Sequence, residues 1–312
     1  MSQGGSSVEK GKLIQKVGII TQKVAAELIA LDEGDRVPTV VELSERYGVS
    51  RGTVQTAFSL LREEGAITLQ PRGHMGTFLT FLDRIKLIEF AGVQTLVGVM
   101  PLPYSKKYEG LATGIYETLQ NSGLSAVLAF MHGSDHRLEG LAERRYDFAV
   151  MSQLTAQYYI DRGEPVRIVE NFGHYSYVGR HVLLVREDYD KTGIHRVGVD
   201  NTSVDQKTLT RAYFGGSDVE YVPLIYNQII HYLNTLKIDA AVWNLDDIDL
   251  VGNHLKYKLL DDRMFSVVDT EAVVICRRDN ELVYHLLRRL LERESVLLYQ
   301  KEVLEGKITP HY

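Results

Sequence analysis

The stretch from residue 40 to residue 79 constrains the fold more than any other part of the chain, because two helical patterns joined by a tight turn precede a glycine-rich hairpin pattern. Thr39 and Glu42 have the spacing of a capping box, which begins the first helix. Gly48 can adopt the left-handed conformation that ends this helix, and Ser50 can cap the next one. These residues predict a helix-turn-helix.

The second predicted helix has an apolar stripe and a polar first turn. We expect the stripe to pack inward and to comprise Val54, Ala57, Phe58, Leu60 and Leu61. Strand patterns at residues 66–69 and 75–80 flank a turn at residues 71–73 and predict a β-hairpin wing. In such a fold the start of the second helix reaches base edges, where arginine suits guanine and glutamine suits adenine. The expected DNA contacts are therefore Arg46, Ser50, Arg51, Thr53, Gln55, Thr56, Arg72 and His74.

This pattern resembles the GntR group of winged-helix bacterial regulators. The shared phrases are V-S-R-x-T-V at residues 49–54, E-E-G at residues 63–65 and G-T-F at residues 76–78. Two features depart from the group, because Gln55 stands where arginine is common and the wing tip has the sequence R-G-H-M-G at residues 72–76. The resemblance implies docking on duplex DNA and leaves the operator sequence open. A winged helix used only for protein contacts is the alternative.

Composition limits the remaining possibilities. The chain of 312 residues is long enough for two or three domains, and 45% of its residues are hydrophobic, as in ordinary globular proteins. No apolar run approaches the length of a membrane span, and residues 1–7 lack the apolar core of a signal peptide, so we expect a cytoplasmic protein without membrane contact. The single cysteine, Cys276, cannot form an intrachain disulfide and is expected in the core.

The charge of the chain favours a dimeric DNA binder. The net charge is −6, and the first 83 residues hold nine Lys and Arg against ten Asp and Glu. Phosphate contacts should therefore give one copy only modest affinity. Two copies on a palindromic operator, as a homodimer, are the expected arrangement.

Beyond Phe81 the pattern changes to alternating strands and helices. We expect a winged-helix domain at residues 1–81, a linker at 82–94 and an effector domain at 95–312. Two blocks of strand and helix patterns begin at residues 95 and 195 and predict two α/β lobes. Apolar strand patterns at residues 181–186 and 267–277 could carry the chain from one lobe to the other and back.

Both blocks end on a similar phrase, Y-D-F-A-V at residues 146–150 and I-D-A-A-V at residues 238–242. This repeat resembles type 2 periplasmic-binding-protein folds, which also serve as sensor domains of cytosolic regulators. Longer strings resemble the YhfZ-type transcriptional regulators, which join a short winged helix to such a domain; they are residues 100–104, 108–112, 197–201, 205–207, 214–218, 241–244 and 270–274. The resemblance covers most of the chain and implies a regulator, without identifying its effector.

Ligands of parallel α/β sheets bind at the carboxyl ends of the strands, so the residues that follow each strand are the candidate effector contacts. They are Pro101, Tyr104, Ser105, Ser152, Gln153, Asn201, Thr202, Ser203, Trp243 and Asn244. Backbone N–H groups at residues 201–203 would favour an anion. Simple helix capping explains Ser203 equally well, and a rigid turn explains residues 101–105 equally well.

Three weaker patterns have plainer interpretations. The sequence H-G-S-D-H at residues 132–136 offers two imidazoles and one carboxylate, so we expect a polar loop over the cleft and no metal site. Asp246, Asp247 and Asp249 are expected in a solvated turn. The apolar spacing in residues 281–304 predicts a helix packed on a sheet, with a dimer seam as the alternative.

The sequence lacks a P-loop, a complete dinucleotide fingerprint, an H-E-x-x-H motif and a G-x-S-x-G motif, so we expect neither an enzyme nor a cofactor. The combined prediction is a transcriptional regulator that senses a small polar or anionic metabolite between two lobes and binds double-stranded DNA. An enzyme or a solute-binding protein on the two-lobed fold, with the winged helix serving protein contacts, is the alternative.

Overall fold

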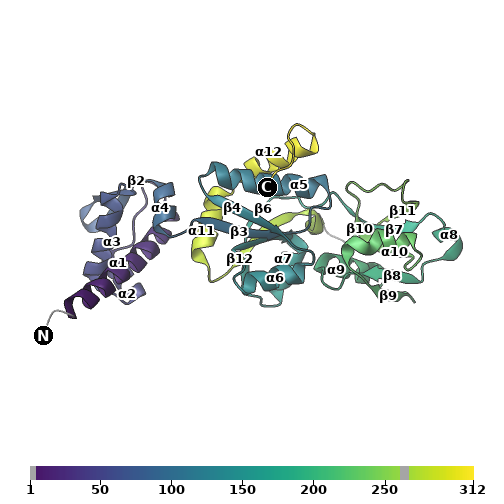
Figure 1. Ribbon diagram of the computed structural model, residues 1–312, viewed down its shortest axis with the longest axis horizontal. Coiled ribbons are helices and arrows are strands. Elements are labelled where there is room, and N and C mark those ends of the chain that lie inside the picture. Colours follow the sequence, from purple (N-terminus) through teal and green to yellow (C-terminus); the bar gives the residue numbers. More distant parts are fainter. Residues whose placement is uncertain (1–4, 261–266) are drawn as a thin grey trace. The chain divides into compact units, whose positions relative to one another are not determined.

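The computed structural model describes residues 5–260 and 267–312. Residues 1–4, part of the segment expected to lack a signal peptide, lie outside the described residues. Contacts between Cα atoms divide the chain into two compact units, residues 1–95 with 123–125, and residues 96–122 with 126–312. Figure 1 traces the elements of both units. Among the described residues, no helix combines the length and apolar character needed to cross a membrane.

The first unit is a winged helix-turn-helix, as predicted. Its elements are α1 (Gly5–Ile29), α2 (Val40–Tyr47), α3 (Arg51–Glu63), β1 (Ile67–Pro71), the 3-10 turn η1 (Gly73–Met75), β2 (Thr77–Leu82) and α4 (Arg84–Phe90). Strands β1 and β2 pair antiparallel and form the wing. Helix α1 packs its buried residues Val24, Ala25 and Leu28 in a core formed with α3 and α4.

The local signals of the helix-turn-helix are confirmed. Thr39 and Glu42 form a reciprocal capping box at the start of α2, and Gly48 ends that helix with a φ of 61°. Ser50 caps α3 by accepting a hydrogen bond from the N–H of Thr53. The predicted stripe of α3 is buried except at Leu60, which is half-buried.

The segment expected as a linker contains a helix. Leu82 ends β2, Asp83 caps α4 by accepting from the N–H of Lys86, and the next seven residues are helical. Leu87 and Ile88 are buried, and α4 packs on α1. One amphipathic helix of two turns is too short to show a clear period in the sequence, so tertiary packing decides its structure.

The second unit consists of two lobes. Lobe 1 contains β3 (Thr95–Met100), α5 (Lys106–Asn121), β4 (Ser125–Phe130), α6 (Ser134–Ala142), β5 (Phe148–Ser152), α7 (Gln153–Asp161), β6 (Val166–Asn171), β12 (Ala272–Arg277), α11 (Glu281–Leu290) and α12 (Arg293–Leu304). Lobe 2 contains β7 (His181–Arg186), α8 (Tyr189–Thr192), β8 (Arg196–Val199), α9 (Val204–Tyr213), β9 (Glu220–Pro223), η2 (Tyr226–Gln228), α10 (Ile229–Asn234), β10 (Ala240–Asn244) and β11 (Leu255–Leu259). The 3-10 turn η3 (Val267–Thr270) precedes β12.

The two sheets repeat one topology. The strand order is β4-β3-β5-β12-β6 in lobe 1 and β9-β8-β10-β7-β11 in lobe 2. In each sheet the strand that arrives from the other lobe, β12 or β7, pairs antiparallel with both of its neighbours. The predicted crossing at residues 181–186 is therefore confirmed. In the predicted run at residues 267–277 the strand covers only residues 272–277, because residues 267–270 form η3.

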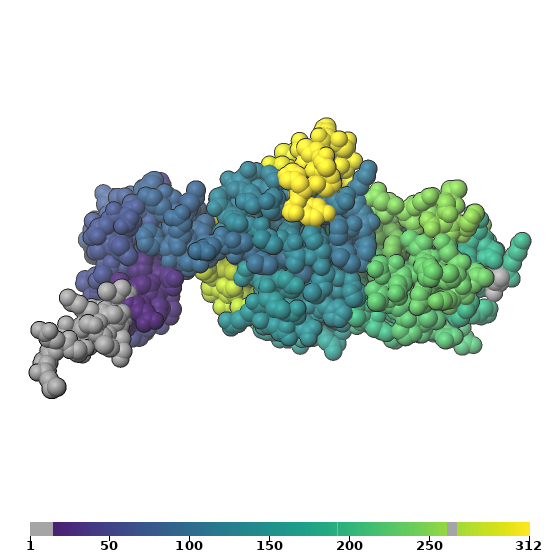
Figure 2. Space-filling view, viewed as in Figure 1, coloured from purple at the N-terminus to yellow at the C-terminus, as the bar shows by residue number. Residues whose placement is uncertain are grey.

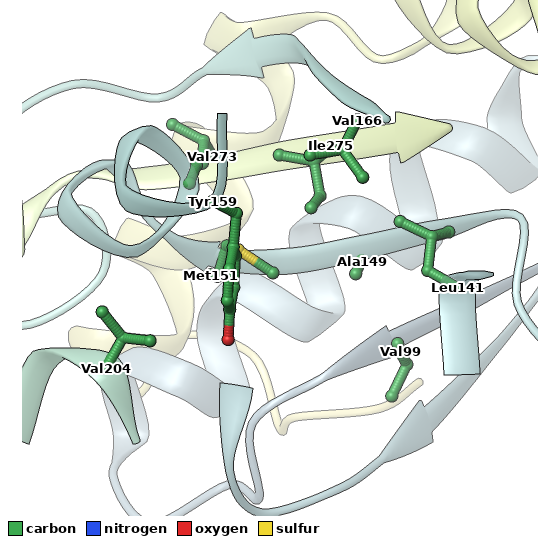
Figure 3. Close-up of a cluster of buried hydrophobic side chains, with 10 residues drawn as sticks. Val99, Leu141, Ala149, Met151, Tyr159, Val166, Val204, Val273 and Ile275 are labelled. Carbon is green, nitrogen blue, oxygen red and sulfur yellow. The ribbon is translucent and has the colours of Figure 1, made fainter. Parts of the chain in front are cut away.

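The core of lobe 1 includes one residue of lobe 2. Sheet residues such as Val99, Met151 and Ile275 pack with Tyr159 of α7, and Val204 at the start of α9 joins the same cluster (Figure 3). Val204 has no exposed surface. The lobes therefore share apolar contacts in addition to polar ones.

The expected helix at residues 281–304 is two helices, because α11 ends at Leu290 and α12 begins at Arg293. Helix α12 packs on α5, where a side chain added at Gly110 or Gly114 would meet the backbone of Gln300 or Val296. In Figure 2 the C-terminal atoms, in yellow, lie over the teal atoms of lobe 1. The two glycines permit this close approach of the helices.

Candidate functional site

The start of α3 presents exposed polar side chains beside the wing. Arg51, Gln55 and Thr56 are exposed. Thr56 donates to the carbonyl of Gly52. Over the described part of the first unit, the side chains of Arg51 and Gln55 have neither a hydrogen bond nor an ion pair, so they are available to reach base edges.

Other predicted DNA contacts have partners within the protein. Thr53 is buried, and its hydroxyl lies 2.9 Å from the Ser50 hydroxyl, so both side chains stabilise the start of α3. Arg46 donates to both carboxylate oxygens of Glu27 at 2.7 Å, and Tyr47 also donates to Glu27. This contact ties α2 to α1 and offsets the charge of Arg46.

The wing carries two of the predicted contacts and one that the sequence did not indicate. Arg72 stacks over the Phe78 ring with its guanidinium carbon 4.5 Å from the ring centroid, and His74 is exposed. Arg36 pairs with Phe78 through an isolated β-bridge, and its side chain lies against Gly76. Arg36 comes from a loop without a periodic pattern, so its place at the wing depends on tertiary structure.

A groove of about 620 Å³ runs between α3 and the wing. Residues from α2, α3 and both strands line it: Val37, Pro38, Thr39, Val40, Gln55, Phe58, Ser59, Arg62, Leu69, Pro71, Gly76 and Thr77. Gln55 is the only predicted contact among them, and Ser59 and Arg62 were missed because they follow the first turn of α3. The groove extends the candidate nucleic-acid interface beyond that first turn.

The second candidate site is a cavity of about 50 Å³ between the two lobes. Its lining is Pro101, Tyr104, Tyr108, His132, Gly133, Ser134, Arg137, Tyr177, His181, Asp200, Ser203, Asp205, Gln206 and Tyr226. The cavity lies at the carboxyl ends of β3 and β8, where the fold places ligands. Three of the predicted effector contacts line it, Pro101, Tyr104 and Ser203. Residues 132–134, from the segment expected to be a polar loop, also line it, although Ser134 is the first residue of α6.

A second cavity of about 110 Å³ adjoins the first through Tyr104 and Tyr226. Trp243 and Asn244, which the sequence indicated, line this second cavity. Trp243 is also packed in the core of lobe 2, with its ring parallel to that of Tyr226 and the centroids 4.2 Å apart. Its position combines the two interpretations that the sequence offered, core residue and wall.

The remaining predicted effector residues lie outside both linings. Ser105 caps α5, and Gln153 accepts a hydrogen bond from the side chain of Asn171. The Asn201 carbonyl accepts from Lys207, and Thr202 donates its hydroxyl to Asp200. Ser152 is buried and contacts the other lobe.

Asp205 is the central polar contact between the lobes, and sequence reasoning missed it. It comes from α9 of lobe 2, and its Oδ1 accepts from the hydroxyls of Ser152 at 2.6 Å and Thr155 at 2.9 Å in lobe 1. Burial raises the pKa of the Asp205 carboxyl, against the opposing effects of His181 and the two hydroxyls. A carboxylate at the start of α7 also lies at the positive end of the helix dipole.

Further hydrogen bonds join the lobes at both sides of the cleft. The Ser134 hydroxyl accepts from the N–H of Val204 at 3.0 Å. Asp247 accepts from the N–H of Lys106 at 2.6 Å. The acidic turn at residues 246–249, expected to be solvated, therefore takes part in contacts between the lobes. Figure 2 shows the teal atoms of lobe 1 directly against the green atoms of lobe 2.

Arg137 is a buried cation at the cavity. Its Nη1 donates to the carbonyl of Met131 at 2.9 Å, while its Nε is buried without an acceptor. Across residues 5–260 and 267–312 it has no ion pair. The Tyr104 hydroxyl is also buried without a partner. Buried polar groups in proteins are usually hydrogen-bonded, so two unpartnered groups at one cavity indicate a place for a ligand.

His181 is buried, lines the cavity and is paired with Asp269. Its Nδ1 lies 2.6 Å from Asp269 Oδ2. Burial lowers the pKa of His181, but the hydrogen bond and charge of Asp269, with the charges of Asp205 and Asp246, outweigh it and raise the pKa above its ordinary value. The pair is an acid–base group inside the cleft.

Comparisons with known proteins match these two units. The family model described as the YhfZ C-terminal domain matches residues 83–312, and a helix-turn-helix domain model matches residues 32–79. The protein YhfZ of Escherichia coli (strain K12) is 35% identical over 96% of this chain and 98% of its own length. The HTH-type transcriptional regulator Rv1152 of Mycobacterium tuberculosis is 37% identical over 70 residues, which are 22% of this chain and 56% of that protein.

Solved structures agree with the fold. The crystal structure of YhfZ from Shigella flexneri has 35% sequence identity and a TM-score of 0.62, and covers 73% of this chain and 97% of that one. The periplasmic VFT2 domain of BvgS from Bordetella pertussis, at 12% identity and a TM-score of 0.50, shares the two-lobed fold over 70% of this chain and 97% of its own. The fold is thus a helix-turn-helix joined to a periplasmic-binding-protein-like α/β domain, and the chain belongs to the YhfZ family.

Proposed function

We propose that the chain is a cytoplasmic transcriptional regulator that binds duplex DNA and senses a small polar metabolite between its lobes. The observation that carries the proposal is the exposed pair Arg51 and Gln55 at the capped start of α3, beside a wing with Arg72. Among the described residues, the side chains of this pair have no hydrogen bond or ion pair. The helix-turn-helix match and the similarity to a protein named as a transcriptional regulator support it. The Nε of Arg137 and the hydroxyl of Tyr104, which have no hydrogen-bond partner among the described residues, support the sensing role.

The DNA-bound form in this proposal is a homodimer. One winged helix contacts a half-site, and a two-fold pair of α3 helices about 34 Å apart matches two half-sites one turn apart. The resulting operator is palindromic and can be contacted in the GntR manner, with α3 in the major groove and the wing on the minor groove or phosphates. The low number of basic residues in the first unit makes two copies necessary.

The sensing step in this proposal is stabilisation of the contact between the lobes. Asp205, Ser134 and Asp247 already join the lobes. A ligand that contacts both walls of the cavity adds to these bonds and changes the equilibrium between separated and joined lobes. A coupling free energy of about 1 to 3 kcal/mol between the cleft and the DNA would change operator affinity about 5- to 150-fold.

A second candidate function is an enzyme on the same fold. The buried His181–Asp269 pair favours it, because a histidine oriented by a carboxylate is a common general base. The regulator remains our proposal because the first unit would have no part in catalysis. If the wild-type protein consumed a cleft ligand and His181→Ala did not, the result would favour the enzyme hypothesis.

Selection of DNA from random duplexes tests the proposal directly. Wild-type protein is expected to enrich a palindromic sequence, and Arg51→Ala is expected to lose about 1 to 3 kcal/mol of discrimination at one base pair of each half-site. Arg144→Ala is the matched control, since Arg144 is an exposed residue of lobe 1 paired with Asp279. Failure of the wild type to enrich any sequence would exclude specific DNA binding.

A further inference from the structure

The cavity contains a site for an anionic group. Arg137 is 4% exposed and uses one terminal nitrogen for Met131, so its Nε and the other terminal nitrogen form an edge with two donors. Within the described chain, neither of these two donors has a hydrogen bond. A carboxylate matches the two parallel donors of such an edge, whereas a single carbonyl oxygen does not.

Tyr104 adds a donor to the same site. Burial and the charge of Asp200 raise the pKa of Tyr104 to about 12, although Arg137 opposes the shift. The hydroxyl therefore keeps its proton at neutral pH, and residues 5–260 and 267–312 offer it no acceptor. A carboxylate held by Arg137 would supply that acceptor.

The same cavity contains a site for a cationic group. The rings of Tyr104, Tyr108, Tyr177 and Tyr226 all line it, and aromatic faces attract ammonium groups. Asp205 lines the cavity among these rings, and the described residues donate hydrogen bonds to its Oδ1 but not to its Oδ2.

The other carboxylate of the cavity and its buried histidine are already partnered. Asp200 accepts from Thr202 through Oδ1 and from the N–H of Tyr226 through Oδ2. His181 is paired with Asp269. Asp205 is therefore the carboxylate best placed to receive a cation.

The size of the cavity limits the distance between the two charges. Arg137, Tyr104 and Asp205 all line one cavity of about 50 Å³, so the anion site and the cation site are next to each other. One short molecule can therefore carry both charged groups.

We propose that the interlobe cleft binds a small zwitterion of amino-acid or betaine size, with its carboxylate on Arg137 and Tyr104 and its ammonium group among the tyrosine rings and Asp205. The inference rests on the proposed sensing function of the cleft. It narrows the ligand from any small polar metabolite to a molecule with both charges.

Binding to the purified full chain can be compared across matched probes. Isothermal titration and thermal shift would use L-alanine and glycine betaine as zwitterions, propionate as the anion, tetramethylammonium as the cation and propionamide as a neutral compound. At least one zwitterion is expected to bind at least about tenfold more tightly than every other probe, because it satisfies both sites in one molecule. Equal affinity for a zwitterion and propionate or propionamide, or no binding by either zwitterion, would overturn the proposal.

One substitution, with a matched control, separates the two ends of the ligand. Arg137→Gln is expected to weaken zwitterion binding at least about tenfold and to leave tetramethylammonium binding nearly unchanged, because it removes only the anion site. Arg145→Gln is the control, since Arg145 is an exposed arginine that follows α6 and pairs with Glu143. Equal loss in both variants, or retained zwitterion affinity in Arg137→Gln, would contradict the assignment.

Tyr104 keeps the test valid if Arg137→Gln does not fold. Tyr104→Phe removes only the hydroxyl and is expected to weaken binding of the zwitterion more than that of tetramethylammonium. Tyr104→Leu removes the ring and is expected to weaken binding of both. If either variant binds the zwitterion like the wild type, its part in the site is excluded.

The DNA assay distinguishes failure of this inference from failure of the proposed function. Binding of propionate or propionamide alone, with a change in DNA affinity, would overturn the zwitterion inference and leave sensing intact. Tight zwitterion binding without any change in DNA affinity would support the ligand class and contradict the sensing function.

Discussion

At the scale of single residues, Trp243 connects the cavity to an optical signal. It is the only tryptophan in the sequence, and it lies parallel to Tyr226, which lines the cavity. A ligand that contacts Tyr226 should change the environment of the indole ring and therefore the tryptophan emission. We expect this change to saturate with the same dissociation constant as calorimetry.

Trp243→Phe is the control for this signal. The variant should lose the emission change and keep calorimetric binding, because phenylalanine can still stack on Tyr226. An emission change in the wild type that does not saturate with the calorimetric constant would show that the signal arises elsewhere.

The buried carboxyl of Asp205 should make the stability of the protein depend on pH. Because its pKa is raised, the folded state holds the proton more tightly than the unfolded state, so the stabilisation is complete below the unfolded pKa and is lost as the pH rises through the folded pKa. Asp205→Asn keeps an oxygen acceptor for Ser152 and Thr155 and has no charge to bury. The variant should therefore gain in melting temperature relative to the wild type as the pH rises from 4 to 8.

A pH-independent effect of Asp205→Asn would contradict this prediction. If Asp205→Asn lowered the melting temperature by the same amount at every pH, the carboxylate would stabilise the joined lobes through a contact that does not titrate in this range.

At the scale of elements, the repeated aspartates secure the beginnings of two strands. Asp147 precedes β5 and accepts from the N–H of Val97, and Asp239 precedes β10 and accepts from the N–H groups of His195 and Arg196. Both contacts lie at the end of the sheet opposite the carboxyl ends of the parallel strands. The repeated phrase in the sequence is thus explained by strand pairing rather than by ligand contact.

Asp239 should be the more important of the two for stability. Burial raises its pKa, but hydrogen bonds from Arg186, Arg196 and two backbone N–H groups outweigh this and lower it to about 2. Its stabilisation is therefore complete above the ordinary aspartate pKa and is lost as the pH falls through about 2. Asp239→Asn is expected to reduce the free energy of unfolding by about 1 to 3 kcal/mol at pH 7.

Urea unfolding at pH 7 and pH 3 would measure this effect. The difference between Asp239→Asn and the wild type should be smaller at pH 3, because part of the wild-type stabilisation is already lost. Asp218→Asn, an exposed substitution in the same lobe, should change little. An equal destabilisation by both variants would refute the role of Asp239.

Elements with a long, regular pattern could be predicted from the sequence, and those decided by packing could not. The helix-turn-helix, the wing and β3 follow from caps, glycines and apolar period. Strand β11 and helix α4 are short and depend on neighbours that are distant in sequence. The apolar period runs through residues 281–304 without a gap, so the break between α11 and α12 was also missed.

Part of the cleft lining could also be predicted from the sequence. Pro101, Tyr104 and Ser203 follow strands, and the general location of ligands in α/β sheets is sufficient to indicate them. Arg137 lies inside α6 and Asp205 inside α9. A side chain within a helix faces the cleft only because of how that helix packs, which a single sequence does not state.

At the scale of the whole molecule, the proposed function joins a DNA-binding unit to a ligand-binding unit in one chain. By linkage, a ligand that changes DNA affinity must have its own affinity changed by DNA in the same ratio. We expect the zwitterion to bind the protein–DNA complex and the free protein with dissociation constants that differ by the same factor as the two DNA affinities. Unequal factors, measured by titration in both orders, would indicate separate populations of protein.

The most direct test of the central claim is the affinity of the full chain for the palindromic DNA that it selects, measured with and without the cleft ligand at fixed salt. The account predicts a footprint over two half-sites and an affinity that changes about 5- to 150-fold when the ligand is added. Arg137→Gln should keep the footprint and lose most of the ligand effect. A footprint whose affinity is the same with ligand present and absent, or no selected sequence at all, would contradict the account.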